Sequence, residues 1–431
     1  MRLSGSHASH RVGQVSPTRL SAPIAAFAAV AVLAGLAAPA AASGSAKRAA
    51  ITTTAVKVGA PGNPSVGIVP FTDAVYQSCA DAPQTSPACQ MVGGVNYRYR
   101  IGELEVTVRQ WVRFLNTVDP QGNGGHGLYD PTEASAGWPK YGSINRSANA
   151  SAGHHYSVAY PSWNDKPYGF ADFIQAARFA NSLSNGRLLS KEATSANGFR
   201  YVTYRVRLAR QSRRGMYDLS DPGTGRTARS GFVVPSQNEW IKAAYFDPSG
   251  GGTFSYWKYP TNPGVFGDGS ATAPSVTTLN PGNGDVTNAA TQPLATYHPS
   301  SAAAPTWCPA AVEPRSDCSE ANPFGIDPTT YAKLYQGNVS TVGGAQTTSP
   351  WGTLDQGGNA VEWTDTVTPP PFGTTGKRVW RRLHGGIANA PAYQLWLSAI
   401  GLQPQRNPFY QTTYPWLGFR IGTIGKLKAA R

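Results

Sequence analysis

The chain has 431 residues with 47 glycines, 35 prolines and only 14% charged residues, which argues against a helical bundle and for a turn-rich globular protein. Aromatic residues make up 11% of the chain, enough for a packed core, and this excludes wholesale disorder. The net charge of +14 is mostly dispersed, with clusters at 205–214 and 377–382. A mildly basic exported protein without a nucleic-acid partner is our interpretation, and a nucleic acid or another anionic polymer as partner is the alternative.

The N-terminus has the features of a signal peptide. Arg2, Arg11 and Arg19 precede an apolar run at 24–38, and an Ala-x-Ala site at 40–42 follows it. This order predicts cleavage after residue 42, a secreted or periplasmic location, and no membrane span in the mature protein. The alternative is retention as an anchor, although the run is short for a span and rich in alanine.

Beyond the signal peptide, we divide the chain by composition. Small polar residues at 43–55 predict a linker, and a single domain is expected from 56 to 425. Within it, residues 296–350 show no clear periodicity and are interpreted as an insertion.

The four cysteines form two local pairs of identical spacing, Cys79 with Cys89 and Cys308 with Cys318. An even number in an exported protein predicts two disulfides with this pairing. The rival interpretation is a metal site built from four thiolates, but the C-x2-C spacing typical of such sites is missing.

Three helices are predicted because a capping residue stands three positions before a Gln or Glu, ahead of apolar residues at helical spacing. The capping pairs are Thr107 with Gln110, Asp172 with Gln175, and Ser236 with Glu239. Short strands are predicted at 97–106, 201–207, 378–383 and 418–421. Few helices, short strands and long Gly/Pro/Asn loops predict an α+β domain.

Five segments, in this order, resemble the formylglycine-generating enzyme family, also called sulfatase-modifying factors. They are IGELEVT at 101–107, AARFAN at 176–181, VPSQNEW at 234–240, GTLDQGGNAVEW at 352–363, and the pair GG at 385–386 with GFR at 418–420. The resemblance covers residues 56–424. It implies a C-type-lectin-like fold of the formylglycine-generating subclass, with much irregular structure.

The resemblance also locates a copper site that this sequence has altered. Copper-dependent members carry two cysteines shortly after the Gly-Gly pair, since thiolates suit Cu(I). Residues 385–396 contain no cysteine, and the two positions align near Ala390 and Leu395. The usual Ser after Gly-Gly is Ile387, and a usual Trp is Val361. We therefore expect neither copper nor formylglycine-generating oxidase activity.

A structural Ca²⁺ is implied by the same resemblance. Asp355 and Glu362 are the carboxylate ligands, and Gly358 and Ala360 supply carbonyls. The alternative is that both carboxylates only cap turns through hydrogen bonds.

Aromatic and polar residues are concentrated between Gly386 and Gly418, where lectin-like relatives bind ligands. Such residues offer rigid contact area with polar tips, although any one of them could instead fill the core. The predicted ligand-binding residues are Asn389, Tyr393, Trp396, Arg406, Tyr410 and Tyr414.

Two functions are compatible with this sequence. The first is a binding or structural module that recognises a glycan, a peptide or another surface partner without copper. The second is a metal-dependent oxidoreductase of the same family that uses a non-cysteine site. The seven histidines are scattered, and the adjacent pair His154–His155 points to opposite faces if it lies on a strand.

Overall fold

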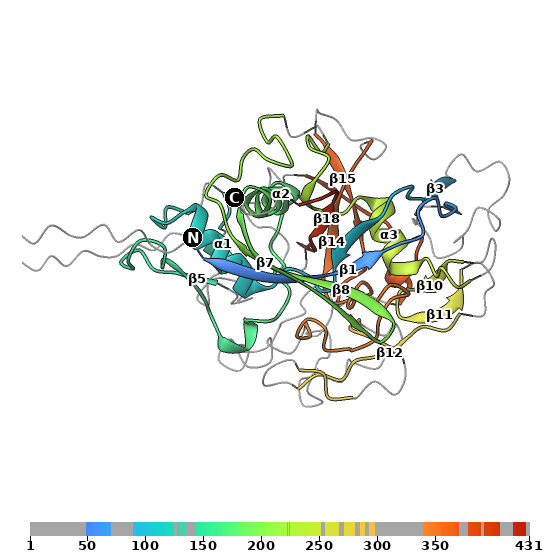
Figure 1. Cartoon of the computed structure of the whole chain (residues 1–431). Helices are drawn as coiled ribbons and strands as arrows, with labels where there is room; N and C mark the ends of the chain where they lie inside the picture. The colour runs from blue at the N-terminus through green and yellow to red at the C-terminus, as the bar shows by residue number, and fades with distance from the viewer. Residues whose placement is uncertain are drawn as a thin grey trace, which may run out of the picture. The chain divides into compact units, whose positions relative to one another are not determined.

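The structure is a computed structural model, shown in Figure 1. It describes residues 49–69, 89–124, 127–129, 131–133, 144–221, 223, 225–250, 255–266, 271–280, 285–288, 293–297, 339–369, 378–388, 392–405 and 417–427. The predicted signal peptide 1–42 and most of the predicted insertion lie outside these residues. Within them, no helix is long and apolar enough to cross a membrane.

The capping boxes predicted from the sequence are all present in the structure. The helices are α1 (Val108–Val118), α2 (Phe173–Ser184) and α3 (Gln237–Tyr245), and in each the cap side chain and the third helical residue exchange hydrogen bonds with the backbone. These bonds satisfy amide groups that a helix start leaves without partners. Short 3-10 turns occur at η1 (Pro131–Glu133), η2 (Pro161–Trp163) and η6 (Ala392–Leu395).

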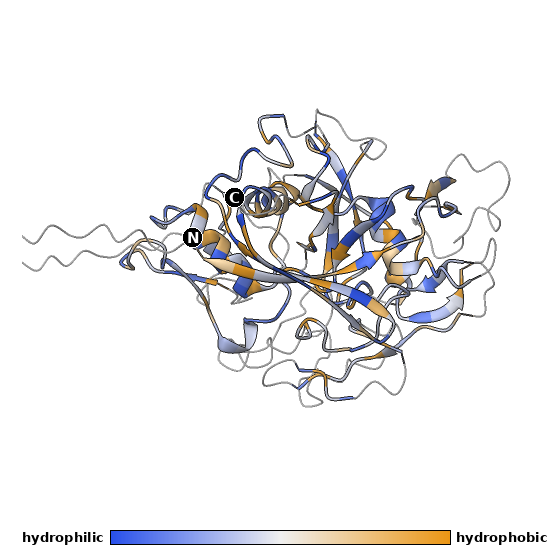
Figure 2. Cartoon of the chain, viewed as in Figure 1, coloured by the Kyte–Doolittle hydropathy of each residue, from blue (hydrophilic) through white to orange (hydrophobic). Residues whose placement is uncertain are grey.

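The largest sheet has the strand order β7-β8-β1-β4-β18-β9 and is antiparallel throughout. Figure 1 shows β1, β7 and β8 as long strands side by side. Apolar and polar residues alternate along β8, visible in Figure 2, because only one face of this strand meets the core. The bounds are β1 Ala50–Val58, β4 Tyr99–Gly102, β7 Arg187–Ala196, β8 Phe199–Arg207, β9 Gly231–Val233 and β18 Gly422–Ile424.

A second sheet has the order β16-β15-β14-β17 and carries the Gly-Gly segment at one strand end. Its bounds are β14 Val361–Thr368, β15 Trp380–His384, β16 Gly401–Pro404 and β17 Leu417–Gly418. The remaining strands form two-stranded ribbons: β2 (Val66–Ile68) with β3 (Gln90–Val92), β5 (Ile144–Arg146) with β6 (Tyr156–Val158), β10 (Trp257–Tyr259) with β11 (Asn262–Val265), and β12 (Ser275–Val276) with β13 (Leu294–Ala295).

The main core lies between α1, α2 and the large sheet. Trp111 of α1 is fully buried and stacks on Tyr168, with ring centroids 4.4 Å apart. Phe179 of α2 and Phe419 pack against the same indole. Burying such large rings supplies much of the hydrophobic driving force of the domain.

Two predicted boundaries are wrong. The linker was expected to reach residue 55, yet residues 50–55 belong to β1, where Ile51 and Ala55 are buried. Small and β-branched residues fit a sheet as well as a linker, so composition alone did not separate the two. A single strand was expected at 418–421, but β17 ends at Gly418 and β18 begins at Gly422 because the chain passes here from one sheet to the other.

Candidate functional site

A buried ion pair joins the last two of the five family-like segments of the sequence. Glu362 of β14 and Arg420, which precedes β18, are both fully buried. The guanidinium donates to both carboxylate oxygens, with N–O distances of 2.6–2.9 Å, and Trp240 Nε1 donates to Oε2 at 2.8 Å. Arg420 also donates to the carbonyls of Gly102, Glu103 and Leu354. The ion pair thus ties β14 to the end of β4 through Arg420 and to α3 through Glu362.

Two more carboxylates lie in the electrostatic range of this pair. Burial raises the pKa of Glu105 well above its ordinary value, and the charges of Asp355 and Glu362 raise it further. Burial likewise raises the pKa of Asp355 to about 6, although its bond from the Gly343 amide and the Arg420 charge oppose the shift. The positive charge of Arg420 therefore stabilises three buried carboxyl groups: Glu105, Asp355 and Glu362.

The loop between Asp355 and Glu362 is held by backbone contacts that tolerate little change. Gly358 has φ +86°, and a Cβ there would lie 2.0 Å from the Thr296 carbonyl oxygen, so only glycine fits. Asn359, with φ +62°, donates from its amide to the same carbonyl. Its side chain accepts from Ser340 and donates to Glu105. The ends of the predicted insertion are thereby fastened to this loop.

These contacts show what the four predicted calcium ligands do in the structure. Glu362 faces a guanidinium, Asp355 accepts from the Gly343 amide, and the amides of Gly358 and Ala360 donate to the Gly385 carbonyl and to Glu105. Within the described residues, no group of three or more His, Cys, Asp or Glu side chains is arranged to hold a metal ion. The cationic partner of Glu362 is Arg420, so this carboxylate does not fit the predicted role. The calcium assignment stays a prediction.

An aromatic group lies beside the Gly-Gly segment, on η6, on the residue that follows η6, and on β10. Trp396 donates from Nε1 to the Tyr259 hydroxyl at 2.7 Å, and its ring centroid is 6.2 Å from that of Tyr393. The Lys258 ammonium lies 4.6 Å from the centroid of the Trp396 ring. Tyr393 and Trp396 are both partly exposed, whereas Lys258 and Tyr259 are largely buried beneath them. We call these four residues the aromatic face.

The structure thus brings together two of the six predicted ligand-binding residues, Tyr393 and Trp396. The other four lie outside the described residues: Asn389, Arg406, Tyr410 and Tyr414. Sequence reasoning missed Lys258 and Tyr259, which come from a strand more than 130 residues earlier. Their adjacent cationic and aromatic side chains were the available signal.

His384, at the end of β15, was also passed over as an isolated histidine. Its ring is buried and stacks on Trp240 with centroids 5.1 Å apart, and neither ring nitrogen has a hydrogen-bond partner. Burial lowers its pKa to about 3, helped by the charge of Arg382. The imidazole is therefore neutral at pH 7.

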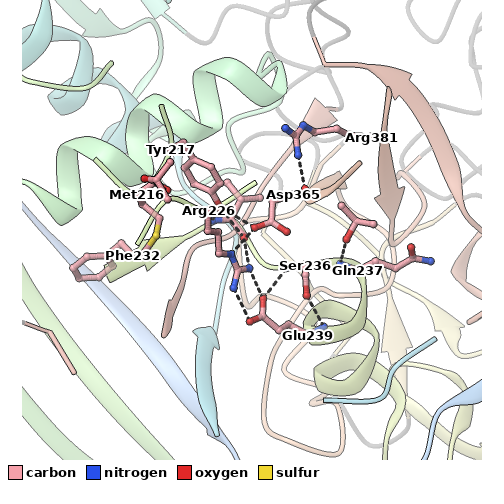
Figure 3. Close-up of polar contacts among 12 residues, drawn as sticks. Met216, Tyr217, Arg226, Phe232, Ser236, Gln237, Glu239, Asp365 and Arg381 are labelled. Carbon is pink, nitrogen blue, oxygen red and sulfur yellow. Dashed lines mark hydrogen bonds and ion pairs between the residues drawn. The ribbon is translucent and has the colours of Figure 1, made fainter. Parts of the chain in front are cut away.

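A second buried ion cluster, shown in Figure 3, fastens the loop after β8 to α3 and β14. Arg226 donates to Glu239 and Asp365 with N–O distances of 2.5–2.9 Å. Tyr217 donates to Asp365 at 3.0 Å. Each charge has a hydrogen-bonded partner, and this cluster is best explained as structural.

Comparison with known proteins decides the family. The sequence matches the domain described as "Sulfatase-modifying factor enzyme 1-like domain" over residues 84–421, more than three quarters of the chain. The chain belongs to this family. The predicted α+β fold of the formylglycine-generating class is thereby confirmed.

The solved structures that this chain resembles are distant. Treponema denticola variable protein 1 is 14% identical with a TM-score of 0.38, covering 87% of this chain and 99% of its own. CarF is 14% identical with a TM-score of 0.38, and the match covers 88% of this chain and 100% of CarF. PvdO from Pseudomonas aeruginosa is 12% identical with a TM-score of 0.38, and the match covers 87% of this chain and 94% of PvdO. No curated protein matches the sequence.

Within this sulfatase-modifying-factor domain, one position aligned with a copper cysteine can be placed. Leu395 is fully buried, packs with Tyr259 and Tyr297, and its carbonyl accepts from Tyr245 at 2.9 Å. An apolar side chain here completes a small core, and Ala390 lies outside the described residues. Cys89 is the one described cysteine and is not free. The partners in both predicted disulfides, with Cys79, Cys308 and Cys318, lie outside the described residues, and the pairings stay predictions.

Proposed function

We propose that this member of the family is an exported binding module that uses its aromatic face to recognise a glycan, a peptide or another surface partner. The observation that carries the proposal is the grouping of Tyr393 and Trp396 over Lys258 beside the Gly-Gly segment. A partly exposed indole held by a hydrogen bond is a rigid contact surface, which lowers the entropic cost of binding.

The chemistry of the aromatic face supports a ligand with both apolar and polar groups. Aromatic rings offer flat area to a sugar ring or a peptide side chain, and tyrosine hydroxyls add polar contacts at the edge. The Lys258 ammonium makes a cation–π contact with the Trp396 ring, which helps to hold the ring in place. Leu395 replaces a metal-binding thiolate with an apolar core contact, which supports binding over copper oxidation.

We predict that Trp396→Ala lowers affinity for the ligand found on a glycan or peptide array at least tenfold, about 1.4 kcal/mol. Trp396→Phe should retain part of the binding, because a ring remains in place. Met91→Ala is the control, since Met91 is 63% exposed on β3 and belongs to none of these contacts. Titration followed by tryptophan fluorescence measures the affinities, and thermal unfolding checks that each variant folds. Equal binding by Trp396→Ala and the wild type would refute the proposal.

The rival function is a metal-dependent oxidoreductase with a non-cysteine site. Metal analysis of the purified protein separates the two, because the binding module is expected to hold neither copper nor iron in stoichiometric amount. Calcium that a chelator removes, with a lower unfolding temperature, would support the predicted calcium site. Stoichiometric copper or iron accompanied by oxygen uptake would favour the oxidoreductase instead. If the protein holds no metal, takes up no oxygen and still binds its ligand, the binding module is supported and the calcium prediction is wrong.

A further inference from the structure

Arginine side chains gather on the outward face of the β7–β8 hairpin. Arg187 and Arg207 are direct cross-strand partners, and both are exposed. Arg205 lies two residues before Arg207 on the same face, opposite Ser190. Three more exposed arginines follow in the next loop: Arg210, Arg213 and Arg214. We call these six residues the arginine surface.

The arginine surface has little acidic compensation. Two like charges directly opposite each other on neighbouring strands destabilise a sheet. Among the ion pairs of the described residues, the one that involves this surface joins Arg214 to Asp218 at 3.7 Å, with both side chains well exposed. Glu192, opposite Thr203, is the acidic residue on the same strand pair. The opposed arginines lower the stability of the sheet, and binding of an anionic partner to them would explain why they are present.

A cavity of about 1130 Å³ opens beside this surface, between the end of α2, the start of β7 and β9. Arg187 is its one charged lining residue, and Ser184, Asn185 and Ser230 add polar groups. Its apolar wall includes Met216 and Phe232, which lie next to each other in Figure 3.

The arginine loop is fastened to the rim of this cavity. Asn185 Nδ2 donates to the carbonyls of Gln211 and Arg214, at 3.1 and 2.7 Å. Asn185 itself lines the cavity, so the loop that carries Arg213 and Arg214 is held beside it. Arg187 thus links the arginine surface to the cavity, whereas Arg205 and Arg207 lie on the opposite face of β8 from Val206, which lines the cavity.

We propose that the arginine surface binds a carboxylate-bearing polysaccharide, with Arg187 and Arg207 binding one uronic acid group on the outward face of the hairpin. The guanidinium fork matches a carboxylate in geometry and charge. Hydroxyl side chains suited to sugar hydroxyls flank Arg205 on both sides, from Thr52 of β1 and Ser190 of β7. This site is separate from the aromatic face and does not depend on the proposed function.

A polysaccharide fits this surface better than a nucleic acid does. Proteins that bind single strands stack bases on aromatic side chains. On the hairpin, Tyr204 is on the buried face, while Phe199 and Tyr201 lie in the half of β8 away from Arg207, where Tyr201 packs against a core cluster. The arginines are thus accompanied by hydroxyls instead of rings.

The test measures binding of fluorescein-labelled polygalacturonate to the purified protein by anisotropy at low and high salt. We expect binding that weakens with salt and a loss of at least tenfold for the double variant Arg187→Gln/Arg207→Gln. The matched control Lys191→Gln/Arg200→Gln removes the same charge from the same hairpin, away from the Arg187–Arg207 pair, and should lose less than threefold. Arg205→Gln alone should give a smaller loss than the first pair, and Trp396→Ala none.

Three results would overturn the proposal: no binding of polygalacturonate, equal losses for the two double variants, or tighter binding of DNA than of polygalacturonate. The first double variant should unfold at the same temperature as the wild type or higher, because it removes opposed like charges. A folded protein that has lost only polygalacturonate binding, and retains the ligand of the aromatic face, confirms a separate site.

Discussion

Replacing Arg420 by methionine is expected to lower the free energy of unfolding by about 3–5 kcal/mol, the usual cost of removing one partner of a buried ion pair. The reason is the arrangement around this residue: Glu362 loses its guanidinium, and Glu105 and Asp355 lose the one positive charge that offsets their burial. Three backbone carbonyls lose a donor as well. Urea unfolding followed by tryptophan fluorescence measures the change.

The matched control for this variant is Arg109→Met. Arg109 pairs with Asp165, but both side chains are nearly half exposed, so its loss should cost less than about 1 kcal/mol. The double variant Arg420→Met/Glu362→Gln should be less destabilised than the sum of the two single changes, because it leaves no unpaired charge at Glu362. A cost for Arg420→Met no greater than that for Arg109→Met contradicts the structural role given to this ion pair.

Replacing His384 by phenylalanine is expected to make the protein more resistant to acid. The folded state holds the pKa of His384 at about 3, below its ordinary value of 6.5. Unfolding therefore takes up a proton, and the stability that the neutral ring contributes is complete above pH 6.5 and is lost as the pH falls towards 3. At pH 5 the loss is about 2 kcal/mol. Phenylalanine keeps the stacking on Trp240 and abolishes this loss.

Asp355 also titrates in this pH range, so the variant must be compared with the wild type at each pH. Arg382 stays charged, while Asp355, with its pKa raised to about 6, opposes the trend because acid relieves its burial. Glu362 faces His384 across β14 and β15 and is held by Arg420. The difference between the two unfolding curves, from pH 7.5 to 4.5, isolates the imidazole. A difference that does not change with pH would show that His384 is not buried as a neutral ring.

Local sequence signals predicted the helices because a helix start is decided within four residues. Thr107 with Gln110, Asp172 with Gln175 and Ser236 with Glu239 all form their capping boxes. The family was likewise readable from five ordered segments, and its match over 84–421 confirms it. The absence of cysteine after Gly386 is a property of the sequence alone. These conclusions need no knowledge of distant contacts.

Strands were harder to predict, because their partners lie far apart in the chain. Residues 50–55 resemble a linker in the sequence. In the structure they pair with β8, and Ile51 and Ala55 are buried in the core. The stretch 418–421 resembles one strand, but its first residue ends β17 of one sheet, and β18 of the other sheet begins only after it. A strand is stabilised by the strands that it pairs with, and the sequence of one segment does not identify these partner strands.

The sequence by itself determined the class of protein, the positions of its helices and the loss of the copper thiolates, since each depends on nearby residues or on a family pattern. Only the tertiary structure decided that Glu362 meets Arg420, that Trp396 rests on Lys258, and that Arg187 stands opposite Arg207 beside a cavity. Each of these contacts joins separate elements, and their distances follow from how the sheets and helices pack together.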